Sequence, residues 1–108
     1  MRYYVLLAAL LFCAPSNAGY DANISGVVTS VLTYTYDGRI YIRLDNQPQS
    51  HPQCLVDYFA VDASVPDSAR SQLLARLLVA YTNGDPVNIG YDSQGDCSHG
   101  RIRVYRIG

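Results

Sequence analysis

The chain has 108 residues, including eight arginines and nine aspartates, and it contains neither lysine nor glutamate. This length suits one small domain and leaves no room for two. The formal net charge of −1 provides no excess of positive charge for holding the phosphates of a nucleic acid. We therefore predict a single small domain without a nucleic-acid partner.

The first residues have the features of a secretory signal peptide. Arg2 supplies a positive start, and a short apolar run and small residues follow it. We predict that residues 1–18 are the signal peptide and that 19–108 form the mature domain, which is secreted or periplasmic and has no transmembrane segment. A lipoprotein signal that uses Cys13 is the alternative, but Phe12 stands where such a signal needs a small residue.

Cys54 and Cys97 remain in the mature domain, and two cysteines in an exported chain predict one disulfide. His51 and His99 lie close to them in the sequence, so a zinc site with Cys and His ligands is an alternative use of the four residues. The exported context favours the disulfide. We predict no metal site and no cofactor.

The first half of the mature domain alternates between apolar and polar residues, which indicates β-strands. Residues 24–36 and 39–44 are predicted strands, and the turn 37–38, Asp-Gly, joins them as a two-residue hairpin that would pair Tyr36 with Arg39. In this register one face of the hairpin is aliphatic and faces the core. The predicted core residues are Val27, Val31, Ile40, Ile42 and Leu44.

A helix is predicted between the two halves of the domain. Ser64 is the expected N-cap, Asp67 lies near its positive end, and Gly84 ends it with a left-handed cap. Apolar residues at helical spacing predict one buried stripe. It consists of Leu73, Leu74, Leu77, Leu78 and Tyr81.

Three further strands are predicted over residues 55–61, 86–91 and 101–107. The chain order is then strand, strand, strand, helix, strand, strand. This is the order of a mainly β, five-stranded OB-fold barrel with one α-helix between strands 3 and 4.

The face opposite the predicted core interleaves tyrosine with arginine, at Tyr34, Tyr36, Tyr41, Arg39 and Arg43. Such a face suits single-stranded nucleic acid in this fold. In an exported protein of negative charge we favour a contact between subunits. Val79 lies opposite the helical stripe, where the helices of a ring of subunits would meet.

Several segments together resemble the B subunits of subtilase cytotoxin and typhoid toxin. They are Asp21, residues 25–28 (Ser-Gly-Val-Val), residues 81–84 (Tyr-Thr-Asn-Gly) and residues 86–91, which end in Tyr91. The resemblance implies a secreted OB-fold virulence protein that forms a homopentamer, binds sialylated glycans on host glycoproteins or glycolipids, and carries a toxic A subunit. It also implies that Asp21, Ser25 and Tyr91 are the glycan-binding residues.

The chain departs from that family at several positions. Arg43 stands where the family has a cysteine, which implies that Cys54 pairs with Cys97. The chain has no tryptophan, and its segment after Tyr91 is shorter than that of the family.

We predict no catalytic residue, because the chain lacks glutamate and a nucleophile motif such as G-x-S-x-G. The function that the resemblance implies is that of a carbohydrate-binding protein, or lectin. The alternative is a secreted or periplasmic OB-fold module for protein–protein interaction, such as an inhibitor or an assembly subunit, without lectin activity.

Overall fold

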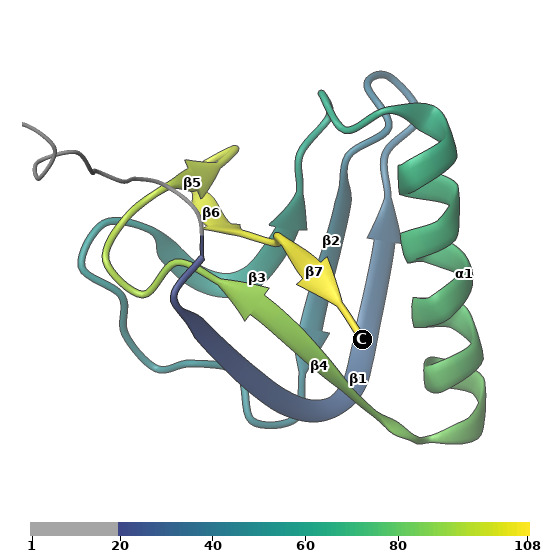
Figure 1. Cartoon of the computed structure of the whole chain (residues 1–108), viewed down its shortest axis with the longest axis horizontal. Coiled ribbons are helices and arrows are strands. Elements are labelled where there is room, and N and C mark those ends of the chain that lie inside the picture. The colour runs from purple at the N-terminus through teal and green to yellow at the C-terminus, as the bar shows by residue number, and fades with distance from the viewer. Residues whose placement is uncertain (1–19) are drawn as a thin grey trace, which may run out of the picture.

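The structure is a computed structural model that describes residues 20–108, so the predicted signal peptide lies outside the described residues. Figure 1 shows a curled sheet with one helix along one side. Within the described residues the elements are β1 (Ala22–Thr33), β2 (Ile40–Leu44), β3 (Leu55–Val61), α1 (Asp67–Asn83), β4 (Pro86–Tyr91), β5 (Cys97–Ser98), β6 (Arg101–Arg103) and β7 (Arg106–Ile107). The fold is mainly β, with the helix between β3 and β4, as predicted.

The strands form one sheet in the order β5-β6-β3-β2-β1-β4-β7. All neighbours are antiparallel except β3 and β6, which are parallel. The prediction of five strands is wrong, because residues 101–107 divide into β6, which pairs with β3, and β7, which pairs with β4. Between them Val104 N donates to Ala60 O over 2.9 Å and Tyr105 N donates to Gly90 O over 2.8 Å. This segment therefore connects both sides of the sheet and curls it into a half-barrel.

The seventh strand comes from a short hairpin of β5 and β6 that was not predicted from the sequence. His99 and Gly100 form its two-residue turn, with φ of 52° and 82°. Positive φ at both turn positions is what a type I′ turn requires. Glycine adopts this conformation without a steric penalty.

The β1–β2 hairpin has a longer turn than predicted. Tyr34 N donates to Arg39 O and Gly38 N donates to Tyr34 O, both over 3.1 Å, so Tyr34 and not Tyr36 lies opposite Arg39. The Asp37 carboxylate accepts from the backbone N–H of Arg39 over 3.2 Å, a local bond that favours this wider loop. The shift is an even number of residues, so Ile40, Ile42 and Leu44 remain in the core as predicted.

A β-bulge corrects the predicted core face of β1. Val28 pairs with Leu44 and Ser30 with Arg43, so Thr29 is an extra residue on β1. An extra residue exchanges the two faces of a strand. Val28, only 3% exposed, therefore takes the core position that was predicted for Val27.

The helix ends as predicted but begins differently. Gly84 has φ of 72° and its N–H bonds to Ala80 O, which is a left-handed C-cap. The Ser64 cap is wrong: the N-cap position is Pro66, and the Ser64 hydroxyl bonds instead to the Asp62 carboxylate.

The buried stripe of α1 is narrower than predicted. Leu77 and Ala80 are buried, and Leu73 and Leu74 pack partly against the core. Leu78 and Tyr81 were predicted to be buried but are 44% and 46% exposed, respectively. Contacts to β1, β4 and β7 use one side of α1, and these two residues project away from that side.

The predicted disulfide between Cys54 and Cys97 is confirmed, with 5.6 Å between the two Cα atoms. It joins the start of β3 to β5 beside the hydrophobic core, in which Phe59, Ile42 and Leu77 are fully buried. The disulfide thus stabilises the side of the sheet away from α1.

Candidate functional site

Polar side chains gather on the outward surface of β1, β4 and β7, which lie side by side in the sheet (Figure 1). Asn23, Gly90 and Arg106 form one row across the three strands. Cross-strand partners share a face, and the neighbouring β4 residue Ile89 is fully buried, so this row faces outward. We call this surface the outer polar face; its residues are Tyr20, Asp21, Asn23, Ser25, Asn88, Gly90 and Arg106.

Ser25 is exposed on this face and is held in place by two asparagines. Asn88 Nδ2 donates to the Ser25 hydroxyl oxygen over 2.9 Å, and Asn46 Nδ2 donates to the Ser25 carbonyl over 2.8 Å. The hydroxyl accepts the first bond and keeps its own hydrogen for a ligand. A Cβ atom at Gly26 would lie 2.0 Å from Asn46 Oδ1, so the close approach of Asn46 requires glycine there.

Asp21 is exposed at the edge of the same face. Its carboxylate accepts from the Ser93 backbone N–H over 2.8 Å and from the Ser93 hydroxyl over 3.0 Å. These two bonds hold the pKa of Asp21 below its ordinary value. Asp21 therefore ties the loop after β4 to the start of β1 and remains charged at neutral pH.

Tyr91 does not share this face with Asp21 and Ser25. It pairs with Ala22, and its ring lies edge-on to Phe59, with 5.7 Å between ring centroids. Phe59 is fully buried, and Tyr91 packs partly buried against the core cluster. The structure thus brings Asp21 and Ser25 to one surface and places Tyr91 on the opposite face of the sheet, toward the core.

Arg106 and Tyr20 lie on the outer polar face and were not predicted from the sequence. Arg106 Nη2 donates to Asn23 Oδ1 over 2.7 Å and also to Asn88 Oδ1. Tyr20 lies against Gly90, where a Cβ atom would be 3.1 Å from Tyr20 Cε1. The sequence shows only a spacing of three between the apolar residues Val104 and Ile107, which interrupts the alternation, and it does not show which sheet edge Arg106 joins.

Tyrosine and arginine side chains from β2, β3, β6 and the turn between β1 and β2 form a separate cluster. Tyr41 lies between Tyr34 and Tyr58, with centroid distances of 5.0 and 5.6 Å, and is only 4% exposed. Arg39 pairs with Asp37, and Arg101 pairs with Asp57. These bonds raise the pKa of both guanidinium groups and lower that of both carboxyls.

Asp37 and Asp57 neutralise Arg39 and Arg101, and Arg43 bonds to the Asp57 carbonyl without an ion pair in the described residues. The arrangement therefore leaves little uncompensated positive charge for phosphates, which argues against the nucleic-acid alternative.

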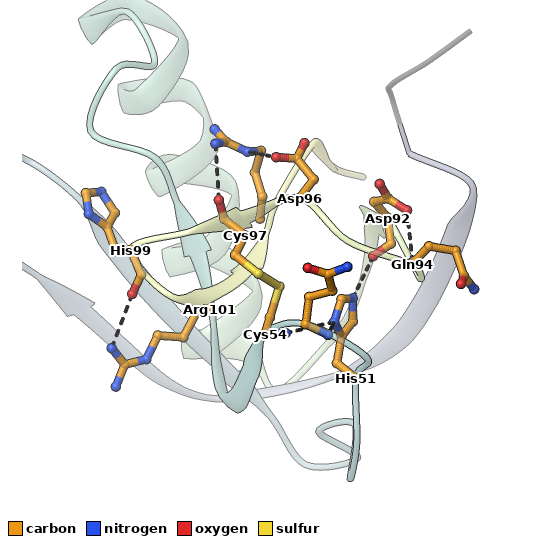
Figure 2. Close-up of a disulfide and its surroundings, with 10 residues drawn as sticks. His51, Cys54, Asp92, Gln94, Asp96, Cys97, His99 and Arg101 are labelled. Carbon is orange, nitrogen blue, oxygen red and sulfur yellow. Dashed lines mark hydrogen bonds and ion pairs between the residues drawn. A yellow bond between two sulfur atoms is a disulfide. The ribbon is translucent and has the colours of Figure 1, made fainter. Parts of the chain in front are cut away.

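The four residues considered for zinc have other partners. The two cysteine sulfurs are bonded to each other, and His51 and His99 lie on opposite sides of that bond (Figure 2). His51 Nε2 contacts Asp92 O over 2.9 Å, and its Nδ1 accepts from Cys54 N over 3.1 Å. Among residues 20–108, no group of His, Cys and Asp side chains is arranged to hold a metal ion.

A groove runs between α1 and the ends of β4 and β7. Its volume is about 820 Å³, and Leu73, Val79, Pro86 and Ile107 line it together with Arg76. It lies beside the exposed part of α1 and is a second candidate surface, more apolar than the outer polar face.

Comparison with family models, with curated proteins and with solved structures gives no match to this chain. In the described part of the chain, no helix is both long and apolar enough to cross a membrane.

Proposed function

We propose that this chain is an exported, non-catalytic lectin that binds sialylated glycans through its outer polar face. We further propose that the half-barrel is an OB-fold that resembles toxin B subunits. The antiparallel run β1–β2–β3, the helix before β4, and the parallel pairing of β3 with β6 support this proposal. Assembly into a homopentamer with a toxin A subunit belongs to the same proposal.

The observation that carries the proposal is the common surface of Asp21 and Ser25. These residues are four positions apart on the outward face of the chain at the start of β1, with Asn23 between them. The surface offers a hydroxyl, amide groups and a carboxylate, which are the groups that bind sugar hydroxyls. Tyr20 adds an aromatic ring that is 42% exposed and can cover an apolar sugar edge.

Tyr91 acts differently in this proposal from Asp21 and Ser25. Because its ring packs on Phe59, it supports β4 from the inner side and positions the strand that carries Asn88. It is therefore a positioning residue for the glycan site.

Such a site is shallow, so one copy binds weakly. Each neutral hydrogen bond contributes about 1 kcal/mol net, and a few of them give a dissociation constant of about 1 mM. Linked copies on a glycan-covered surface raise this strength by avidity. The weak binding of one copy is the reason why the proposal includes an oligomer.

Ser98, His99 and Asp62 meet in the structure, but their arrangement does not support catalysis. Ser98 Oγ donates to Asp62 Oδ1 over 2.6 Å, and His99 Nε2 lies 3.6 Å from the same atom. Both side chains thus contact the aspartate, whereas a nucleophile requires the histidine between serine and aspartate. Ser98 is also only 1% exposed.

A glycan array tests the proposal. We expect the disulfide-bonded protein to bind sialylated glycans and not their desialylated forms. Ser25→Ala and Asp21→Ala should each weaken the signal, while Ser71→Ala, an exposed serine on α1, should not. Absence of binding by the wild type, or equal binding by Ser25→Ala and Ser71→Ala, would exclude this lectin site.

The second candidate function is an exported interaction module, such as an inhibitor or assembly subunit. The exposed part of α1 favours it, because Leu78, Val79 and Tyr81 are 44%, 61% and 46% exposed beside the apolar groove. A second copy of the chain is the partner we assign to this surface. Sedimentation of the wild type and Val79→Ser distinguishes the cases: a module without lectin activity gives an oligomer that Val79→Ser dissociates, together with a blank glycan array.

A further inference from the structure

Arg106 lies across the outer polar face because its neighbour on β4, Gly90, has no side chain. Gly90 lies between Asn23 and Arg106 in their row across the sheet. Because Gly90 has no side chain, the Arg106 guanidinium reaches across β4 and bonds to Asn23 Oδ1 on β1. The same gap receives Tyr20, whose ring centroid lies 5.9 Å from the guanidinium carbon of Arg106.

The partners of Arg106 hold it without neutralising it. Both of its hydrogen bonds use Nη2 and end on neutral amide oxygens, those of Asn23 and Asn88. Within residues 20–108 it forms no ion pair with an aspartate. Four of the other described arginines do, in the pairs Arg39–Asp37, Arg70–Asp67, Arg101–Asp57 and Arg103–Asp96, whereas Arg43 and Arg76, which lie away from the outer polar face, do not.

The charges around Arg106 leave its positive charge available to a ligand. On the outer polar face the carboxylate is that of Asp21, which accepts two bonds from Ser93 and forms no ion pair with Arg106. Arg106 Nε and Nη1 make no hydrogen bond to another described residue. Each of these groups can still donate a single hydrogen bond to a carboxylate oxygen, and a hydrogen bond from a charged guanidinium is stronger than one between neutral groups.

We propose that Arg106 receives the carboxylate of an acidic sugar, with Ser25 and Tyr20 on either side of the sugar ring. This inference rests on the proposed lectin function and adds the group that distinguishes acidic from neutral glycans. Asn23 and Asn88 fix the guanidinium before the ligand arrives, so little side-chain entropy is lost on binding.

The test compares ligands of the same shape and different charge. Disulfide-bonded, ¹⁵N-labelled protein is titrated at constant ionic strength with sialyllactose, with its neutral carboxyl methyl ester, and with lactose. We expect the wild type to prefer the acid over the ester by about tenfold or more, as a charged hydrogen bond implies. Equal binding of acid and ester by the wild type would overturn the role of Arg106 and leave the lectin function intact.

Variants assign that preference to Arg106. Arg106→Gln should bind acid and ester equally, and Arg106→Lys should keep part of the preference because it keeps the charge. Arg43→Gln, an exposed arginine on β2 whose Nη1 bonds to Asp57 O, is the matched control and should behave as the wild type. If Arg106→Gln retains the full preference, the inference is wrong. If the wild type binds none of the three ligands, the lectin function itself fails.

Discussion

Asn88 on β4 joins two groups of the outer polar face. Its amide nitrogen donates to the Ser25 hydroxyl oxygen over 2.9 Å, and its amide oxygen accepts from the Arg106 guanidinium. One side chain thus orients a group on β1 and a group on β7. The relative position of the Ser25 hydroxyl and the Arg106 guanidinium in the proposed glycan site therefore depends on a side chain from the sheet.

The first prediction follows from this relationship. Asn88→Ala should weaken glycan binding at least as much as Ser25→Ala, because it frees both the hydroxyl and the guanidinium. Loss of one neutral hydrogen bond is worth about 1 kcal/mol, or about fivefold in affinity. NMR titration with sialyllactose measures both variants, with Ser71→Ala as the control. Wild-type affinity in Asn88→Ala would show that the Asn88 bonds do not prepare the site.

The second prediction concerns Tyr91. Tyr91→Phe should leave glycan binding and the free energy of unfolding unchanged, because the ring and not the hydroxyl packs on Phe59. Tyr91→Ala should lower the free energy of unfolding by about 2 kcal/mol through lost packing. Denaturant unfolding and glycan titration of both variants measure this. Loss of binding in Tyr91→Phe would indicate instead that the hydroxyl contacts the sugar.

The third prediction is the contribution of the disulfide. Cys54 and Cys97 are separated by 43 positions. Constraining a loop of this size in the unfolded chain stabilises the fold by about 4 kcal/mol in the chain-entropy model. Guanidinium unfolding of the wild type and of the double variant Cys54→Ser/Cys97→Ser measures this difference. Equal unfolding midpoints would contradict it, provided that intact mass confirms the bond in the wild type.

The fourth prediction concerns the end of α1. Gly84 has φ of 72°, and no atom lies within 4 Å of the place that a Cβ atom would take, so its substitution strains only the backbone. Gly84→Ala should therefore lower the free energy of unfolding by about 1 kcal/mol. Gly95→Ala is the matched control, because its φ is not in the left-handed region and its nearest contact is at 4.0 Å. Similar effects of the two substitutions would contradict the assigned cap.

The fifth prediction is a pH dependence centred on Asp62. Hydrogen bonds from Ser64 and Ser98, with the charge of Arg103 nearby, hold the pKa of this carboxyl well below its ordinary value of 3.8. As the pH falls below about 4, the unfolded chain takes up a proton before the folded chain does. The stability that Asp62 contributes is thus complete at neutral pH and is lost as the pH falls through the lowered pKa.

Asp62→Asn lacks this titration and provides the comparison. The difference in free energy of unfolding between wild type and Asp62→Asn should shrink as the pH falls below about 4. Urea unfolding at a series of pH values measures it. A difference that grows as the pH falls would contradict the direction of the shift.

The part of the fold that was predicted from the sequence depends on the local conformation of single residues and on the number of cysteines. Gly84 as a helix stop depends on one backbone conformation, and the pairing of Cys54 with Cys97 was predicted from the two cysteines that remain once the expected signal peptide is set aside. The chain order of the long strands and the helix follows from their hydrophobic periods. These features do not depend on how distant segments pack.

The features that could not be predicted depend on single side chains or on tertiary packing. The Asp37 carboxylate widens the first hairpin, and the extra residue Thr29 exchanges the faces of β1. Arg106 reaches the outer polar face because the last predicted strand breaks between β6 and β7 to pair on both sides of the sheet. Of the candidate site, the sequence therefore placed Asp21 and Ser25 but not the residues that β7 brings to them.

The most direct test of the proposed function is a map of where the glycan binds. A ¹H–¹⁵N NMR titration of the disulfide-bonded protein with sialyllactose should shift the signals of Ser25, Asn88 and Arg106, which lie on three adjacent strands. Signals of the exposed α1 residues Val79 and Thr82 should not move. Shifts confined to α1 and its groove, or no shifts at millimolar ligand, would contradict a sialoglycan site on the outer polar face.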